Sequence, residues 1–487
     1  MEENLIITKQ SEKQRVTWDG LGEEMKRIIR VAGPMVFVYA SQNLLQVVSI
    51  MMIGHLNDEL FLSGAALAIS LATVTGFSLL TGMASGLETI CGQAYGARQY
   101  QKTGVQTYTA IFSLTCVCLP LTIIWISLEN ILVFIGQDPL IAHEAGNFII
   151  WLLPALFAYA ILQPLVRYFQ MQSLLLPMLA TSCVTLCLHI PLCWALVFKT
   201  ELSNVGGALA MSISIWLNVI FLVLYMRYSP ACEKTRAPVS MELFQGIWEF
   251  FRFAIPSAVM ICLEWWSFEL LILLSGLLPN PQLETSVLSI CLNTISTLYA
   301  IAFGIAAAAS TRISNELGAG NPHSARVAVL ASMSFAIMEA TIISGILFVC
   351  RHVFGYTFSN KKEVVDYVTV MAPLVCISVI LDNIQGVLAG KIPTSPLLRI
   401  ARGCGWQHIG VYVNLGAFYL CGIPVAASLA FLAKMSGKGL WIGLQVGAFV
   451  QCALLSTVTS CTNWEQQAMK ARKRLFDSEI SAENILV

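Results

Sequence analysis

Charged residues are scarce in this sequence. Only 11% of its 487 residues are Asp, Glu, Lys or Arg, against roughly 25% in an average globular domain. Hydrophobic residues make up 57% of the chain, and the mean hydropathy is +0.73. A chain of this length with so few charges cannot give several soluble domains a polar surface. The composition therefore excludes most soluble folds and indicates a polytopic membrane protein.

A basic surplus is also missing, since 28 Lys and Arg residues balance 28 Asp and Glu residues. No positive charge is left over to neutralise phosphates, so we expect no nucleic-acid partner. The 15 cysteines include no CxxC pair and lie mostly in apolar runs, and there are only six histidines, so we expect no metal site and no cofactor. The polar, acidic start of the chain predicts no cleaved signal peptide.

Long apolar runs are what the sequence does contain. A helix needs about 20 mostly apolar residues to cross a bilayer, and these runs are too long and too uniformly apolar for barrel strands. Twelve runs qualify, at residues 31–53, 62–87, 105–128, 145–168, 176–198, 204–228, 249–277, 285–312, 327–350, 364–389, 408–433 and 440–462. We therefore expect an all-α integral membrane protein with twelve transmembrane helices.

The basic residues are distributed unevenly between the two sides of these spans. The side that carries both termini holds 22 of the Lys and Arg residues, with Arg167 counted after span four, and the opposite side holds 6. Cytosolic loops carry the excess of Lys and Arg in membrane proteins. Both termini are therefore expected in the cytosol.

The two halves of the sequence repeat at a fixed offset of 222 residues. Residues 32–34 (AGP) match 254–256 (AIP), and residues 95–97 (YGA) match 317–319 (LGA). Six spans in each half give both halves the same orientation, which predicts two six-helix lobes related by a pseudo-two-fold axis along the membrane normal. The polar segment Lys391–Arg399 has no counterpart in the first half. It could be a genuine loop or a splice or gene-model difference.

The expected organisation follows from this repeat. Prolines inside the spans are hinge candidates, in particular Pro34, Pro256 and Pro373. The segments are a cytosolic N-terminal segment (1–30), an N-lobe (31–228), a cytosolic linker (229–248), a C-lobe (249–462) and a cytosolic C-terminal tail (463–487).

Two carboxylates inside the spans distinguish the lobes. Glu264 lies in the middle of span seven and Asp382 well inside span ten, where the repeat offset places Gln42 and Ala160 in the first half. A carboxylate in hydrocarbon costs at least ~2.5–3.5 kcal/mol, unless it binds a proton or finds a partner. Both residues are therefore candidate proton-coupling sites. The alternative is that each stays protonated and only hydrogen-bonds a neighbouring helix.

Neutral polar and aromatic residues near these acids are cavity candidates. One of two adjacent tryptophans in span seven could lie beside Glu264 and bind an organic cation through its ring, while the other faces lipid. Glu269 lies about 140° around the helix from Glu264 and is a weaker candidate. The full set is Asn293, Tyr299, Trp265, Trp266, Asn383, Gln385, Ser378, Gln42, Asn43 and Gln46.

Five segments together resemble the plant branch of the multidrug and toxic compound extrusion (MATE, or DETOXIFICATION) family. They are residues 51–56 (MMIGHL), 82–89 (GMASGLET), 91–97 (CGQAYGA), 315–321 (NELGAGN) and 401–407 (ARGCGWQ). The resemblance implies a secondary antiporter that expels organic compounds in exchange for a cation. The family's acids in spans seven and ten fall on Glu264 and Asp382. Ser49 or its neighbours stand where many bacterial relatives have an aspartate, which favours a proton site in the C-lobe over cation coupling in the N-lobe. The expected coupling ion is H⁺, and Na⁺ is the less favoured alternative.

We therefore expect a proton-coupled exporter of lipophilic cationic or neutral organic compounds, not an enzyme. Its partners would be small organic substrates and the lipid bilayer, and we expect a monomer in the plasma membrane or the vacuolar membrane. An organic-anion exporter of the citrate type would need basic groups in its cavity. A lipid-precursor flippase would need several arginines. A membrane enzyme would need a metal or nucleophile cluster, and His189 has no such partner at ligand spacing.

Overall fold

The computed structural model describes residues 18–56, 58–357, 362–389, 407–460 and 469. These residues form helices joined by short turns, with no strand among them. The segment Lys391–Arg399, for which two explanations stood open, lies outside the described residues.

Twelve helices in the described residues are long and apolar enough to cross a membrane, and each coincides with one of the expected runs. Most extend past the apolar core, as in the first span, which reaches from Asp19 to Gly54. The prediction of an all-α membrane protein with twelve spans is therefore confirmed.

Six of these spans build the N-lobe. Side chains define where its helices begin: Asp58 and Asp138 each accept two backbone N–H groups at a helix start. The helices are α2 (Trp18–Gly54), α3 (Glu59–Ala72), α4 (Ser78–Ala84), α5 (Leu87–Gly96), α6 (Tyr100–Ile126), α7 (Leu128–Ile135), α8 (Pro139–Met171), α9 (Leu175–Phe198) and α10 (Ser203–Tyr228), with a π-helical turn at Thr73–Phe77.

The other six spans build the C-lobe, after a short linker that contains Pro230–Cys232 and α11 (Glu242–Gln245). Its helices are α12 (Ile247–Ser275), α13 (Pro281–Gly318), α14 (Pro322–Val349), α15 (Arg351–Phe354), the turn Gly355–Thr357, α16 (Lys362–Ala389), α17 (Gln407–Asn414), α18 (Ile423–Ala427) and α19 (Ser436–Ser460), with π-helical segments at Leu415–Gly422 and Ser428–Leu432.

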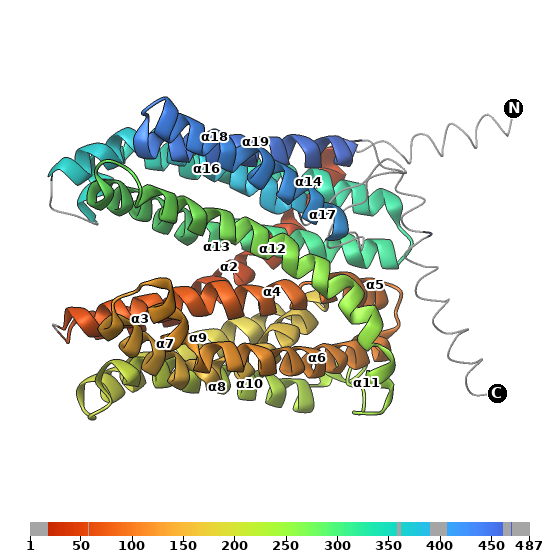
Figure 1. Cartoon of the computed structure of the whole chain (residues 1–487). Coiled ribbons are helices and arrows are strands. Elements are labelled where there is room, and N and C mark those ends of the chain that lie inside the picture. The colour runs from red at the N-terminus through yellow and green to blue at the C-terminus, as the bar shows by residue number, and fades with distance from the viewer. Residues whose placement is uncertain (1–17, 57, 358–361, 390–406, 461–468, 470–487) are drawn as a thin grey trace, which may run out of the picture.

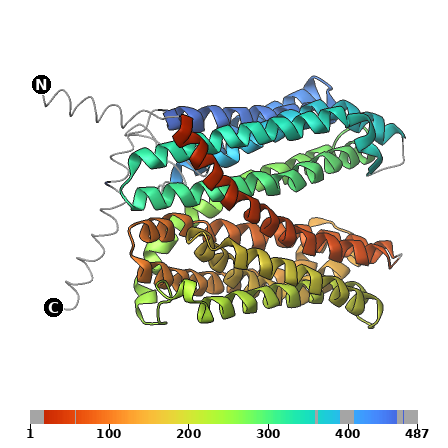
Figure 2. The same cartoon turned by 180° about the vertical axis from the view of Figure 1, so that it is seen from behind.

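The two lobes lie one above the other in Figure 1, and they approach each other at the end where α5, α12 and α17 meet. Away from that end the helices of the two lobes diverge (Figure 1). Helix α2 crosses between them, beginning beside the C-lobe and ending within the N-lobe (Figure 2). Glu24 near its start pairs with Arg312 of α13 at 2.7 Å, and Ser49 near its end contacts His189 of α9.

Contacts between the lobes obey the same offset of 222 residues as the sequence repeat. A Cβ on Gly82 would lie 2.6 Å from Cα of Ala258, and one on Gly304 would lie 2.5 Å from Cγ2 of Val36. These two contacts are equivalent under the repeat. Helix α4 therefore packs on α12 as α13 packs on α2, in the self-complementary manner of a two-fold interface.

The same symmetry relates α5 and the end of α13. Gly96 packs on the backbone of Asn315, and its equivalent Gly318 packs on the backbone of Gln93, the equivalent of Asn315. Glycine allows two helices to approach this closely because it has no side chain. The expected pseudo-two-fold relation between the lobes is therefore present in their packing.

The three hinge candidates lie inside continuous helices, Pro34 in α2, Pro256 in α12 and Pro373 in α16. A proline leaves the carbonyl of the preceding turn without its helical N–H partner and favours a bend. Their role as hinges stays a prediction. The π-helical segments were not expected, since no residue pattern in the sequence announces them.

Candidate functional site

The structure brings Glu264 and Asp382 together. Glu264 on α12 is 6% exposed and Asp382 on α16 is 7% exposed, and the two carboxyl groups interact electrostatically. Tyr299 of α13 donates its hydroxyl hydrogen to Oε1 of Glu264 at 3.2 Å. Both acids also interact with Cys452 of α19. Side chains from four helices of the C-lobe therefore interact electrostatically or by a hydrogen bond around these two acids.

Three buried side-chain oxygen atoms on α16 lack hydrogen-bond donors. Oδ2 of Asp382, Oδ1 of Asn383 and Oε1 of Gln385 are all buried and have no hydrogen-bond partner within the described residues. The amide of Asn383 donates to the carbonyl of Val379 at 3.0 Å. A buried acceptor without a donor is costly. A proton bound at Asp382 would turn one of these unpartnered acceptors into a hydrogen-bond donor.

A second layer of polar residues fixes α12 beside Glu264. Gln451 of α19 donates to Oδ1 of Asn414 at 2.6 Å, and Asn414 donates to the carbonyl of Met260 at 2.8 Å. Tyr419, in the π-helical segment, donates to the carbonyl of Leu263 at 3.1 Å. Sequence reasoning missed these residues, although each is a polar residue within an apolar run. These hydrogen bonds link α12, the helix that carries Glu264, to the later helices of the C-lobe.

Ser378, another candidate, links α16 to α19. Its hydroxyl accepts from Trp441 Nε1 at 3.1 Å and from Gln445 Nε2 at 3.2 Å. Gln445 also donates to the carbonyl of Leu374. These contacts couple the helix of Asp382 to the helix of Cys452.

The aromatic and span-eight candidates are more exposed. Trp265 and Trp266 are 38% and 43% exposed, and Trp266 donates its indole hydrogen to the carbonyl of Val74 in the N-lobe at 3.4 Å. Asn293 is exposed on α13. The ring whose polar group reaches Glu264 is Tyr299 rather than either tryptophan.

Gln42, Asn43, Gln46 and Ser49 form a polar stripe on the first span, and the members of this stripe differ in their surroundings. Gln42 and Gln46 are half-buried, and Asn43 is exposed. Ser49 is completely buried, where its hydroxyl lies 3.2 Å from Nε2 of His189. The stripe therefore does not present one continuous face to the acid pair.

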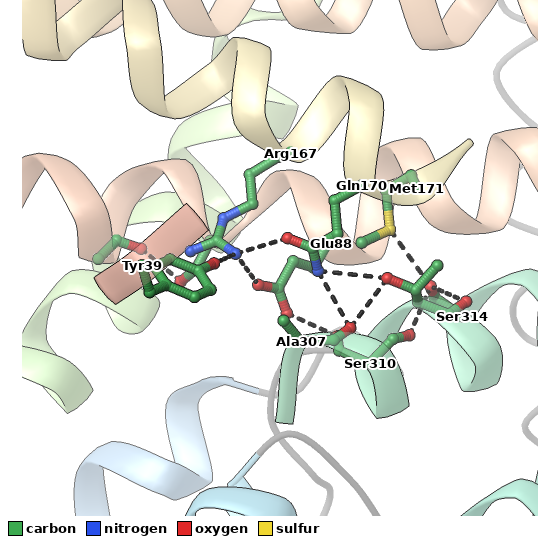
Figure 3. A network of polar contacts seen from close by, with 11 residues as sticks. Tyr39, Glu88, Arg167, Gln170, Met171, Ala307, Ser310 and Ser314 are labelled. Atoms are coloured by element: carbon green, nitrogen blue, oxygen red, sulfur yellow. Dashed lines mark hydrogen bonds and ion pairs between the residues drawn. The ribbon is translucent and has the colours of Figure 1, made fainter. Parts of the chain in front are cut away.

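A buried ion pair outside the predicted site joins Glu88 of α5 to Arg167 of α8. Arg167 Nη1 lies 2.9 Å from Glu88 Oε1, and the side chains are 0% and 3% exposed. Figure 3 shows the hydrogen bonds that extend from this pair to Tyr39, Gln170 and Ser310. Counting Arg167 among the loop residues was wrong, because α8 continues past it to Met171 and the residue is enclosed between the lobes.

Glu339 was also missed by sequence reasoning. It lies in the middle of α14, and both carboxyl oxygens are buried without a hydrogen-bond partner among the described residues. The signal was available, since a glutamate inside an apolar run is itself unusual. Glu269 lies half-buried on α12, five residues beyond Glu264.

The described part of the chain has no group of three or more His, Cys, Asp or Glu residues that could hold a metal ion. His189 is instead enclosed by two hydroxyl groups, with Nδ1 lying 2.8 Å from Oγ of Ser214.

Comparison with known proteins places these features in a family. The MatE family pattern matches residues 34–195 and 256–427, two segments whose starts are separated by the repeat offset. Protein DETOXIFICATION 12 of Arabidopsis thaliana is 60% identical over 467 residues, covering 95% of both chains. Protein DETOXIFICATION 14 of the same plant is 55% identical, covering 98% of this chain and 96% of that one.

Solved structures agree with these sequence matches. The crystal structure of the eukaryotic MATE transporter AtDTX14 superposes with a TM-score of 0.88 at 56% identity, covering 93% of this chain and 99% of that one. An outward-facing multidrug resistance MATE transporter of the MOP superfamily matches with a TM-score of 0.79 at 14% identity, covering 93% and 97%, and shows the shared fold. These relatives are transporters and not enzymes. The chain therefore belongs to the MatE family as a plant-type, multi-pass membrane transporter.

Proposed function

We propose that this chain is a proton-coupled antiporter that exports lipophilic cationic or neutral organic compounds from the cytosol by alternating access. Glu264 and Asp382 bind the proton. The observation that carries the proposal is the buried, electrostatically coupled acid pair in the C-lobe. Two buried carboxylates that interact electrostatically oppose each other's ionisation, so binding one proton is favoured and its release is tied to the hydration of the pair.

The surroundings of Asp382 support a proton rather than Na⁺. A proton needs only one carboxylate oxygen, and Oδ2 of Asp382 is buried with no hydrogen-bond partner among the described residues. A metal cation needs several converging oxygen ligands. Tyr299, which donates to Glu264 at 3.2 Å, would make a weaker hydrogen bond once Glu264 is protonated. Protonation would thus change the contacts between α12, α13 and α16.

A cationic or neutral substrate fits the charge of the site. When both acids are deprotonated the C-lobe carries negative charge beside the aromatic residues Tyr299, Trp265 and Trp266, which suits an organic cation. An organic anion or a lipid diphosphate would need unpaired basic groups. Arg167, the arginine enclosed between the lobes, is neutralised by Glu88 at 2.9 Å. The alternatives of a citrate-type exporter and a lipid-precursor flippase are therefore less favoured.

The placement in the membrane completes the proposal. Without Arg167, the loops on the side of the termini hold 21 Lys and Arg residues against 6 on the opposite side, which supports a cytosolic position for both termini. The end where the lobes meet is then the cytosolic end, and the divergence in Figure 1 opens toward the opposite side. The organisation remains residues 1–30, 31–228, 229–248, 249–462 and 463–487, in a monomer. Plasma membrane and vacuolar membrane both place an acidic compartment opposite the cytosol.

The test is uptake of ethidium, an organic cation, into proteoliposomes with an acidic lumen. Glu264→Gln should abolish uptake driven by the pH gradient, while the protein still inserts and purifies as a monodisperse species. Glu269→Gln is the matched control, because it removes a half-buried carboxylate from the same helix and should keep uptake. Undiminished uptake in Glu264→Gln would contradict the proposal.

A further inference from the structure

We propose that Arg167 is a positioning residue of the transport cycle. It holds Glu88 and Gln170 in place, and these two side chains form the breakable hydrogen bonds that close the lobes at the end near Trp18. This inference rests on the alternating access of the proposed function, and it concerns a part of the molecule away from the acid pair.

The contacts around Arg167 fall into two groups, those that Arg167 makes within the N-lobe and those that its partners make to the C-lobe. Arg167 Nη1 contacts Glu88 Oε1 at 2.9 Å and Gln170 Oε1 at 2.7 Å, both within the N-lobe. The far ends of the same two side chains reach the C-lobe (Figure 3). Ser310 of α13 donates to Glu88 Oε2 at 2.6 Å, and Gln170 Nε2 donates to the carbonyl of Ala307 at 3.1 Å. One guanidinium thus orients two groups that cross the interface.

Gln170 makes a second crossing contact, since its Nε2 lies 3.2 Å from Oγ1 of Thr311. Asn315 adds another by donating to the carbonyl of Met171 at 3.0 Å. All these crossing bonds have a neutral partner on the C-lobe, whereas the opposite charges of Glu88 and Arg167 lie on the same lobe. At this cluster, separating the lobes would therefore break hydrogen bonds without separating Glu88 from Arg167, which makes this part of the closure reversible. An ion pair does join the two lobes at the start of α2, between Glu24 and Arg312.

The position of this contact on the symmetry axis is the second observation. Glu88 and Ser310 are equivalent under the 222-residue offset, and they bond directly to each other. A residue that meets its own symmetry equivalent lies on the pseudo-two-fold axis between the two lobes. The C-lobe has no matching ion pair, since Ser310 and Ala389 stand where the N-lobe has Glu88 and Arg167. The charged residues of this closure are therefore supplied by the N-lobe alone.

Hydrogen–deuterium exchange of the full-length protein in lipid nanodiscs tests the inference without any substrate. Ser310→Ala removes one crossing hydrogen bond and leaves the ion pair intact. We expect exchange in α5 and in residues 302–318 to rise about tenfold or more, the equilibrium shift equivalent to one hydrogen bond to a charged group. Ser332→Ala is the matched control, because Ser332 is also buried but its hydroxyl bonds only the carbonyl of Ala328 in its own helix.

The role of Arg167 requires a further variant. In Arg167→Gln, Glu88 and Gln170 lose the group that orients them, so exchange in residues 302–318 should rise at least as much as in Ser310→Ala. The double variant Arg167→Gln/Ser310→Ala should show no additional rise, because both changes remove the same crossing bond. An additive double variant would overturn the positioning role, since it would mean that the bond to Ser310 forms without Arg167.

Two other results decide the proposal. Exchange in Ser310→Ala that equals the wild type, or that rises equally in Ser332→Ala, overturns it even if Arg167→Gln fails to fold. The outcome is independent of proton coupling, because no pH gradient is applied. Loss of ethidium uptake in Glu264→Gln with unchanged exchange in Ser310→Ala would support the proposed function and overturn this inference. Undiminished uptake in Glu264→Gln with raised exchange in Ser310→Ala would contradict the proposed function and support this inference.

Discussion

The ion pair between Glu88 and Arg167 leads to a prediction about stability. The two side chains are 3% and 0% exposed and their charged atoms are 2.9 Å apart. Replacing one partner by glutamine leaves the other charge buried, which costs about 3–5 kcal/mol. In Glu88→Gln, for example, Arg167 keeps only neutral acceptors, the hydroxyl of Tyr39 and the amide oxygen of Gln170.

The double variant Glu88→Gln/Arg167→Gln buries no charge. It should therefore be less destabilised than the sum of the two single variants, by about 1–3 kcal/mol. Thermal unfolding of the purified protein in detergent, followed by tryptophan fluorescence, gives the apparent melting temperatures of all four proteins. The double variant should melt well above the temperature that adding the two single shifts predicts.

An exposed ion pair on the same protein provides the control. Glu23 and Lys26 are also 2.9 Å apart, but their side chains are 65% and 67% exposed. Water screens such a pair, so the same set of glutamine variants should give a coupling of about 0.5 kcal/mol or less. If the Glu88 and Arg167 variants add, or if the exposed pair couples as strongly, the reasoning about burial is wrong.

Two further predictions concern the contact between the lobes and the hydrogen bonds that hold α12. Gly82→Ala should destabilise the protein by about 1–3 kcal/mol, since its Cβ would lie 2.6 Å from Cα of Ala258, whereas Gly33→Ala, with nothing within 4 Å, should be neutral or stabilising by up to about 1 kcal/mol. Equal shifts in their melting temperatures would contradict the lobe contact. Gln451→Leu removes the donor to Asn414 and should slow ethidium uptake at unchanged expression, while full activity would show that this layer does not support Glu264.

Much of the fold could be predicted because hydropathy reports the membrane spans directly. The offset of 222 residues added the symmetry between the lobes, and the structure repeats that offset in the contacts of Gly82 with Ala258 and of Gly304 with Val36. The acid pair was found by comparing the two halves, since a carboxylate in one lobe without an equivalent in the other calls for an explanation. That comparison needed only the sequence and no knowledge of how the helices pack.

The ion pair could not be found in this way. Arg167 follows an apolar run, where a basic residue normally marks the end of a span, and its partner Glu88 lies near the end of another span. Only the packing of α5 on α13 encloses both, and this depends on glycines that allow the helices to approach. The π-helical segment that carries Tyr419 escaped for a similar reason, because a local change of helical pitch leaves the residue pattern unchanged.

The central claim is that a proton bound at Glu264 and Asp382 is exchanged for the substrate. The most direct measurement is proton movement itself, followed with a pH-sensitive dye trapped in proteoliposomes that have an acidic lumen. Adding ethidium outside should make the lumen more alkaline in the wild type, and the double variant Glu264→Gln/Asp382→Asn should show no such change. Ethidium accumulation without proton efflux in the wild type, or undiminished efflux in the double variant, would contradict the account.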